Sequence, residues 1–269
     1  MGKLTKDLLI GGGVIAGTYA SLNYIAKMGT EDESINIDNP YLDFGVHVRE
    51  TRGAGQTATN YEQVVKPMLD KMLSFFGLIV LSPLFVMISI MVFINDLGPV
   101  FFTQKRIGIG KRYIVIHKFR TMAVTAPNNV PTHQLDDPDQ YITKIGKVLR
   151  KTSLDELPQI WDIFRGRMSI IGPRPALWNQ DDLVMERDRY GANDVMPGLT
   201  GLAQIKGRDE LEISDKARLD GEYVKRLRQG GLKAFFFDVK MFAETLISVI
   251  KHDGVVEGGT GELQKRRGE

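Results

Sequence analysis

The stretch that decides the fold is MLSFFGLIVLSPLFVMISIMVFI, residues 72–94, which contains no charged side chain. A helix rises about 1.5 Å per residue, so a helix of this length would span the roughly 30 Å hydrocarbon core of a bilayer. Ser82 and Pro83 lie in its middle, however, and proline breaks or kinks a helix. Each half would reach only about 15 Å, which favours a re-entrant helix that enters and leaves on one side of the membrane.

Both ends of this stretch are flanked by basic residues, namely Lys66, Lys71, Lys105, Arg106, Lys111 and Arg112. Under the positive-inside rule, this pattern favours two cytoplasmic ends. The backbone interrupted at Ser82 and Pro83 would need a hydrogen-bond partner, either the Ser82 hydroxyl or interfacial water. A rival topology remains open. If residues 8–26 span the membrane with the N-terminus inside, residues 72–94 must cross back.

The composition excludes several classes of chemistry. The chain of 269 residues has no cysteine, so disulfides, thiolate metal sites and cysteine nucleophiles are excluded. Its four histidines are scattered, which argues against a histidine-based metal site. The net charge of +2 does not suggest nucleic acid as a partner. The distribution of charge is more informative, because residues 97–135 lack acids while six Lys or Arg lie within residues 105–120. This asymmetry favours an anionic partner: a phosphate, a nucleotide or lipid headgroups.

Three segments lie outside the apparent functional core. Residues 1–30 form an N-terminal apolar segment, which is a weak membrane helix, an interfacial segment or the apolar region of a signal peptide. Residues 31–63 form a polar, acidic linker. Residues 253–269 are expected to be a flexible tail.

Residues 100–104 and 113–119 are rich in β-branched and aromatic side chains, which predicts a β-hairpin. The Gly-x-Gly between them favours a hairpin turn over a nucleotide loop, because a third glycine is missing. Further along, the patterns predict a basic helix at 141–150, a helix that includes Leu157 and ends at Gly166, strands at 168–171 and 202–205, and a helix over 232–250. The last helix either packs on the core or lies in a membrane interface.

The sharpest local signal is SLDELP, residues 153–158. One interpretation is purely structural, because Ser153 and Glu156 match the S-x-x-E capping box of a helix N-terminus. The other is chemical, because Asp155 and Glu156 follow a basic segment. A carboxylate held near cations stays ionised and could attack a phosphoryl group. A neighbouring carboxylate could then hold Mg²⁺ or act as a base.

Several basic residues could bind phosphate. Strand alternation places Lys118 and Arg120 on one face, although a solvated sheet edge would look the same. Arg174 lies between two prolines, a rigid backbone that suits either fixed phosphate recognition or a salt bridge that closes the turn. Arg208 follows Gly207 and is similarly ambiguous.

The order of these motifs resembles the monotopic phosphoglycosyl transferases, the bacterial sugar transferase family. The matching pieces are the apolar helix with its central Ser-Pro, then GPVFFTQKRIG, HKFRTM, KVLRKTSLDELPQIWDIFRGRMSIIGPRP, MPGLTGLAQIKGR and LDGEYV. The resemblance implies an α+β, monotopic membrane-associated domain over about residues 64–252. It would contain a Pro-broken re-entrant helix, a short β-hairpin and amphipathic interfacial helices, with its catalytic domain on the cytoplasmic face of the cell membrane.

The resemblance also implies an activity. Members of the family move a phosphosugar from a UDP-sugar to polyprenol phosphate, usually undecaprenyl phosphate, and release UMP, which starts the assembly of a surface glycan. Asp155 matches the nucleophile that forms a covalent phosphosugar intermediate and contacts Mg²⁺, and Glu156 matches its supporting residue or general base. The basic residues placed at the phosphate or nucleotide site are Lys118, Arg120, Arg150, Arg174 and Arg208.

The chain departs from the family pattern at Leu202, Lys206 and Met196, where Trp, Asn and a basic residue are common. These departures concern uridine or lipid contacts and leave the transferred sugar open. The sequence also does not name the glycan pathway or the oligomeric state. Two other functions remain open. One is a non-catalytic membrane-surface module that binds anionic lipid through the basic hairpin. The other is an inactive relative that regulates a polysaccharide assembly complex.

Overall fold

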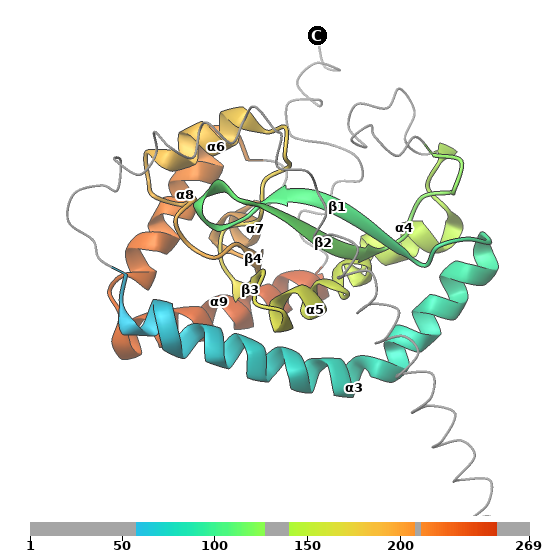
Figure 1. Ribbon diagram of the computed structural model, residues 1–269, viewed down its shortest axis with the longest axis horizontal. Helices are drawn as coiled ribbons and strands as arrows, with labels where there is room; N and C mark the ends of the chain where they lie inside the picture. Colours follow the sequence, from blue (N-terminus) through green and yellow to red (C-terminus); the bar gives the residue numbers. More distant parts are fainter. Residues whose placement is uncertain (1–57, 127–139, 208–210, 252–269) are drawn as a thin grey trace, which may run out of the picture.

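The computed structural model describes residues 58–126, 140–207 and 211–251 (Figure 1), and the side chains of residues 249–251 fall outside that description. The N-terminal segment, most of the predicted linker, Arg208 and the C-terminal tail also lie outside the described residues. Within the described part, helices surround two small sheets. The predicted α+β class is therefore confirmed.

The apolar stretch forms most of helix α3 (Lys66–Asn95), which continues from the π-helix η4 (Tyr61–Val65). Together they are the one helix in the described part of the chain that is long and apolar enough to cross a membrane. Only 17% of its most apolar window is buried, so it is not a core helix of the protein. α3 continues through Pro83 and changes direction along its length (Figure 1).

The backbone gap at Pro83 is closed locally. Proline has no N–H to donate to the carbonyl four residues earlier, which belongs to Ile79. The Ser82 hydroxyl donates to that carbonyl instead, at 2.8 Å. Of the two partners considered from the sequence, the structure therefore provides the Ser82 side chain.

The predicted hairpin is confirmed. Strands β1 (Phe101–Ile107) and β2 (Tyr113–Phe119) pair antiparallel from Phe101↔Phe119 to Ile107↔Tyr113, and the short 3₁₀ turn η5 (Ile109–Lys111) joins them. The rings of Phe101 and Phe119 stack with centroids 5.4 Å apart, and Phe119 also contacts Phe85 of α3 at 5.6 Å. This aromatic contact fixes the base of the hairpin on the second half of α3.

Three short helical elements follow the hairpin: α4 (Lys144–Lys151), the 3₁₀ turn η8 (Leu154–Glu156) and α5 (Gln159–Phe164). The Thr143 hydroxyl caps α4 by accepting from the Gly146 N–H at 2.9 Å. Apolar side chains from all three elements pack on α3, namely Ile145, Leu149, Leu154, Leu157 and Trp161. The 3₁₀ turn η8 thus lies against β2 and α4, and its Leu154 packs on an apolar cluster to which α3 contributes.

A second, parallel sheet lies beside α5. It pairs β3 (Ser169–Ile171) with β4 (Gly198–Thr200), and helix α6 (Asp181–Asp188) lies in the connection between them. The strand predicted at 202–205 is wrong, because these residues form helix α7 (Leu202–Lys206). One turn of helix buries Leu202 and Ala203 together, and so short an apolar run has no period that separates helix from strand.

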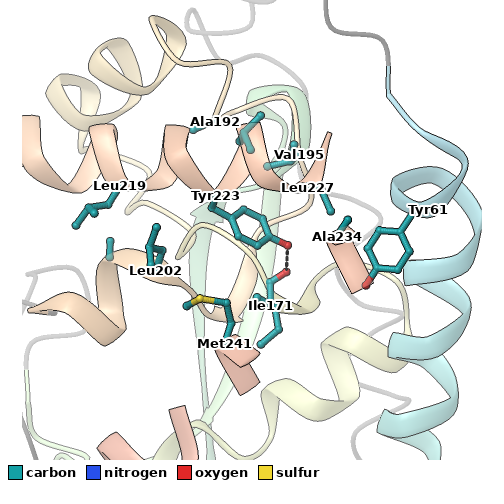
Figure 2. Close-up of a cluster of buried hydrophobic side chains, with 12 residues drawn as sticks. Tyr61, Ile171, Ala192, Val195, Leu202, Leu219, Tyr223, Leu227, Ala234 and Met241 are labelled. Atoms are coloured by element: carbon teal, nitrogen blue, oxygen red, sulfur yellow. Dashed lines mark hydrogen bonds between the residues drawn. The ribbon is translucent and has the colours of Figure 1, made fainter. Parts of the chain in front are cut away.

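Helices α8 (Ile213–Leu227) and α9 (Gly231–Lys251) complete the main core. Tyr223 of α8 lies at its centre, and its hydroxyl donates to the Ile171 carbonyl at 2.9 Å (Figure 2). Asp238 of α9 is buried and accepts hydrogen bonds from Tyr61 and Lys66 at 2.8 and 2.9 Å, and its other oxygen lies 3.2 Å from the Tyr223 hydroxyl. These bonds attach the start of the apolar helix to the core.

The outer sides of α3 and α9 carry the exposed apolar surface, defined as the large apolar side chains of these two helices that are exposed. Its members are Met68, Met72, Leu73, Phe75, Phe76, Ile79, Val80, Met87, Ile90, Phe93 and Ile94 of α3, and Leu232, Phe236, Val239, Phe242, Leu246 and Ile247 of α9. Surfaces of this extent mark membrane or protein contacts. Helix α9 also buries Ala234 and Met241, so core packing is confirmed for its inner side.

Candidate active site

Asp155 and Glu156 are presented by a tight turn rather than by a regular helix start. Ser153 has a φ of 56°, which is uncommon for a residue other than glycine, and the 3₁₀ turn η8 follows it directly. The Ser153 side chain makes no capping hydrogen bond. The capping-box interpretation is therefore wrong, and the Glu156 side chain is directed elsewhere.

Glu156 is held by two cations. Lys118 Nζ of β2 lies 2.9 Å from Glu156 Oε1, and Arg174 binds both carboxylate oxygens, with Nη1 3.1 Å from Oε2. Burial alone would raise the pKa of this carboxyl, but the charges of Arg174 and Lys118 outweigh burial and hold the pKa well below its usual range. Glu156 is therefore ionised at neutral pH, and both of its carboxylate oxygens are bound by cations.

Asp155 lies next to this cluster and has a different environment. Its side chain is only 9% exposed, and burial raises its pKa to about 6. The positive charge of Lys118 opposes that rise, the negative charge of Glu156 adds to it, and Arg150 and Arg174 oppose it. Among the described residues, none donates a hydrogen bond to the Asp155 carboxylate. In this dyad, the Glu156 carboxylate is bound by Lys118 and Arg174, whereas the Asp155 carboxylate accepts no hydrogen bond from the described residues. Below, a carboxylate without such a bond is called uncommitted.

Arg150 approaches from the last turn of α4. Its Nε donates to Thr121 Oγ1 at 2.9 Å, and Thr121 lies two residues after the end of β2, the strand that carries Lys118. The backbone of Thr121 is in turn held by α4, because the Thr143 N–H donates to the Thr121 carbonyl at 3.0 Å. Hairpin and helix α4 therefore fix each other and keep Arg150 close enough to Asp155 to influence its pKa.

Three of the five predicted binding residues gather around the dyad: Lys118, Arg150 and Arg174. Arg120 points to the end of the apolar helix α3 instead, where it pairs with the Asp96 side chain at 3.5 Å and donates to the Asp96 carbonyl. Its side chain is buried, so the solvated-edge interpretation is wrong for Arg120. Arg208 lies outside the described residues.

One pair that supports the site was not predicted from the sequence. Asp162 of α5 accepts the His117 backbone N–H at 2.9 Å and lies 2.7 Å from His117 Nδ1. Both side chains are buried, and burial raises the pKa of Asp162 although its hydrogen bonds with His117 oppose the rise. The pair fixes α5 against β2, one residue from Lys118. The signal in the sequence is an acidic residue on a short, largely apolar helix, which does not indicate a partner.

The LDGEYV segment, residues 219–224, contributes packing contacts within the core of the fold. Asp220 pairs with Arg187 of α6, with 2.8 Å between Oδ2 and Nε, and Tyr223 binds the core as described above. Leu202, which departs from the family pattern, is likewise buried in the core.

The donor set for a metal is small. The described residues contain no group of three or more His, Asp or Glu side chains placed to hold an ion. Asp155 remains a possible ligand, since the oxygens of Glu156 are occupied by Lys118 and Arg174. One protein carboxylate fits Mg²⁺ when substrate phosphates supply further ligands, which is how Mg²⁺ is commonly bound at phosphate-transfer sites.

A buried carboxylate beside three cations is suited to bind an anionic, phosphate-bearing substrate. Comparison with known families agrees with that class. The family model described as bacterial sugar transferase matches residues 61–252. The chain belongs to the bacterial sugar transferase family.

Individual relatives agree. The chain is 35% identical over 212 residues to a UDP-glucose:undecaprenyl-phosphate glucose-1-phosphate transferase of Xanthomonas campestris pv. campestris, covering 76% of this chain and 43% of that protein. It is 35% identical over 177 residues to the exopolysaccharide production protein ExoY of Sinorhizobium fredii, covering 60% and 77%. It is 31% identical over 237 residues to a UDP-galactose-lipid carrier transferase of Erwinia amylovora, covering 81% and 46%. The match thus spans less than half of the Xanthomonas and Erwinia proteins.

Proposed function

We propose that the protein transfers a phosphosugar from a UDP-sugar to a polyprenol phosphate, such as undecaprenyl phosphate, in the synthesis of an exopolysaccharide or another surface glycan. The observation that carries this proposal is the contrast between the two neighbouring carboxylates. Glu156 is ionised and bound by two cations, while Asp155 is buried and uncommitted. The names of the three relatives support the donor and acceptor classes.

The reaction has two displacements at the same phosphorus. In the first, an Asp155 oxygen attacks the sugar-bound phosphorus of the UDP-sugar, the bond to the bridging oxygen breaks, and UMP leaves with that oxygen. The resulting acyl phosphate holds the phosphosugar on the chain. In the second, a phosphate oxygen of the polyprenol phosphate attacks the same phosphorus and expels the Asp155 carboxylate. The product is a polyprenyl diphosphate sugar, and the kinetics should be ping-pong.

Glu156 acts as a positioning residue rather than as a base. A base needs an available lone pair near the proton it removes, and both Glu156 oxygens are bound by cations. Its charge instead keeps Lys118 and Arg174 in place before substrate arrives, so that their donors are preorganised for the diphosphate. When bound, Mg²⁺ would supply further neutralisation of the leaving UMP. Asp155 would be its protein ligand.

The membrane arrangement that fits this reaction is a re-entrant α3. Nucleotide sugars are cytoplasmic, so the dyad must face the cytoplasm at the height of a lipid phosphate. The bend in α3, the Ser82 bond that closes its backbone and the basic flanks of the helix support an entry and exit on the same side (Figure 1). The exposed apolar surface would then lie in the bilayer.

The direct test is release of UMP by the full chain in detergent or nanodiscs, with undecaprenyl phosphate, Mg²⁺ and a panel of UDP-sugars. We expect at least one UDP-sugar to give UMP together with a lipid-linked phosphosugar. Asp155→Asn should abolish both products while the variant stays folded. A chain that binds vesicles but releases no UMP from any UDP-sugar would instead favour the non-catalytic membrane module.

A further inference from the structure

One face of the hairpin is connected to both cations that bind Glu156: it carries Lys118, and it contacts the turn that carries Arg174. The pairing register places Phe102 opposite Lys118, Gln104 opposite Ile116 and Arg106 opposite Ile114. Residues paired across an antiparallel ladder share a face, and every second residue along a strand does too. Lys118, Gln104 and Arg106 therefore lie on the same face. Lys118 reaches Glu156 directly from there.

Arg106 on this face binds the turn that carries Arg174. Its Nη1 donates to the Pro175 carbonyl at 3.1 Å, directly after Arg174 in the chain. Its Nε and Nη2 both donate to Gln104 Oε1, at 3.2 and 2.7 Å, which fixes the plane of the guanidinium. Alongside, the Ile107 N–H donates to the Ala176 carbonyl at 2.9 Å. The edge strand β1 of the hairpin thus binds this turn through the Arg106 side chain and through the Ile107 backbone N–H.

The other side of the same turn is held by β4. The Gly172 N–H donates to the Thr200 carbonyl at 2.8 Å, and the Gly198 N–H donates to the Pro173 carbonyl at 2.9 Å. The two backbones are so close that a Cβ on Gly198 would lie 2.1 Å from the nitrogen of Gly172. The turn therefore has little room to shift toward β4, and the contact with Arg106 sets its position on the hairpin side.

We propose that Gln104 and Arg106 are positioning residues that hold the turn at residues 172–175 so that the Arg174 guanidinium stays on Glu156. Neither residue contacts the dyad in this arrangement. Both act through the Pro175 carbonyl, and the hairpin thereby aligns Lys118 and Arg174 as one unit. The effect on catalysis rests on the proposed function, whereas the effect on the turn itself does not.

The test compares UMP release by the full chain in nanodiscs for Arg106→Ala, Arg174→Ala and the double variant, with UDP-glucose and undecaprenyl phosphate as the first substrates tried. Misplacement of a binding group by about 1 Å can lower a rate by roughly 100-fold. We therefore expect Arg106→Ala to lose about 10- to 100-fold in rate. The double variant should be no slower than Arg174→Ala, because the proposed effect of Arg106 passes through the position of Arg174. Arg106→Lys, which keeps one donor for Pro175, should recover part of the rate.

The matched control is Lys105→Ala. Lys105 lies on the opposite face of β1, with Nζ 3.9 Å from the centroid of the Tyr113 ring, so its loss should leave the rate unchanged. Multiplicative losses in the double variant, or no loss in Arg106→Ala, would overturn the proposal.

Hydrogen exchange separates this proposal from the proposed function. In Arg106→Ala, peptides covering residues 172–177 should exchange faster, and in Lys105→Ala they should not. If the wild-type chain releases no UMP from any UDP-sugar, the proposed function fails and the exchange result still decides the role of Arg106. Unchanged exchange in Arg106→Ala would show that the turn does not depend on this contact, and the positioning role would be rejected.

Discussion

Lys118 Nζ lies 2.9 Å from Glu156 Oε1, and this ion pair joins the β-hairpin to the turn that presents Asp155. Both side chains are largely buried, at 15% and 17% exposure, so water screens the pair less than it would a surface salt bridge. With Arg174 on the same carboxylate, the pair organises the positive side of the site.

Glu156→Gln should slow UMP release by about 100-fold, because a neutral amide no longer holds two cations in place for the diphosphate. Since Asp155 remains, the residual activity should still be well above that of Asp155→Asn. Steady-state rates with saturating donor and acceptor would measure both variants. A Glu156→Gln rate within about threefold of wild type would remove the positioning role assigned to this carboxylate.

Asp155→Asn should make the folded protein more stable above pH 6. Burial raises the pKa of Asp155 from 3.8 to about 6. Between these values the unfolded chain loses its proton first, so the free energy of unfolding falls as the pH rises. The amide avoids this loss, which is on the order of 1 to 3 kcal/mol.

The measurement is thermal or denaturant unfolding between pH 4 and 7 in EDTA. As the pH rises across the interval, wild type should lose stability relative to Asp155→Asn. The exposed Asp182 provides a control, because Asp182→Asn should keep the wild-type slope. Identical slopes in wild type and Asp155→Asn would contradict the buried, uncommitted carboxylate.

Arg120→Lys should weaken the fold and spare substrate affinity. Arg120 binds Asp96 at the end of α3 and does not touch the dyad, so a single ammonium replaces a guanidinium that contacts both the side chain and the carbonyl. We expect a lower unfolding temperature and a KM for the donor within about twofold of wild type. A large rise in KM with unchanged stability would return Arg120 to the binding site where the sequence placed it.

Cysteine labelling tests the topology of α3 cleanly, since the chain has no cysteine of its own. A single Thr59→Cys lies just before the helix that begins at Tyr61. In a re-entrant arrangement both ends of that helix are cytoplasmic, so a membrane-impermeant thiol reagent should label this cysteine only after the cells are opened. Labelling in intact cells would instead support a helix that crosses the bilayer.

Much of the fold could be predicted because its signals are local. The hairpin strands are rich in β-branched and aromatic residues, and the apolar helix is long and uncharged. Helix α6 was missed because its eight residues, DDLVMERD, contain few apolar positions and no clear stripe. Helix α8 carries charges throughout, and its buried side, with Ala217 and Tyr223, is evident only from its neighbours.

The site was predictable in its chemistry and less so in its geometry. The resemblance identified the dyad and the cations Lys118 and Arg174, which the structure brings together. Alternation alone also grouped Arg120 with them, but β2 ends at Phe119 and Arg120 turns to Asp96. Contacts such as that of Arg106 with Pro175 join residues that are 69 apart in the chain, and no local pattern records them.

The central claim is that Asp155 carries the phosphosugar covalently. The most direct measurement is intact-protein and peptide mass spectrometry of the full chain after incubation with a turnover-competent UDP-sugar and no polyprenol phosphate. The account predicts one phosphosugar adduct on the peptide that contains Asp155, stoichiometric release of UMP, and loss of the adduct when undecaprenyl phosphate is added. Lipid-linked product formed at a normal rate without any adduct, or by Asp155→Asn, would contradict it.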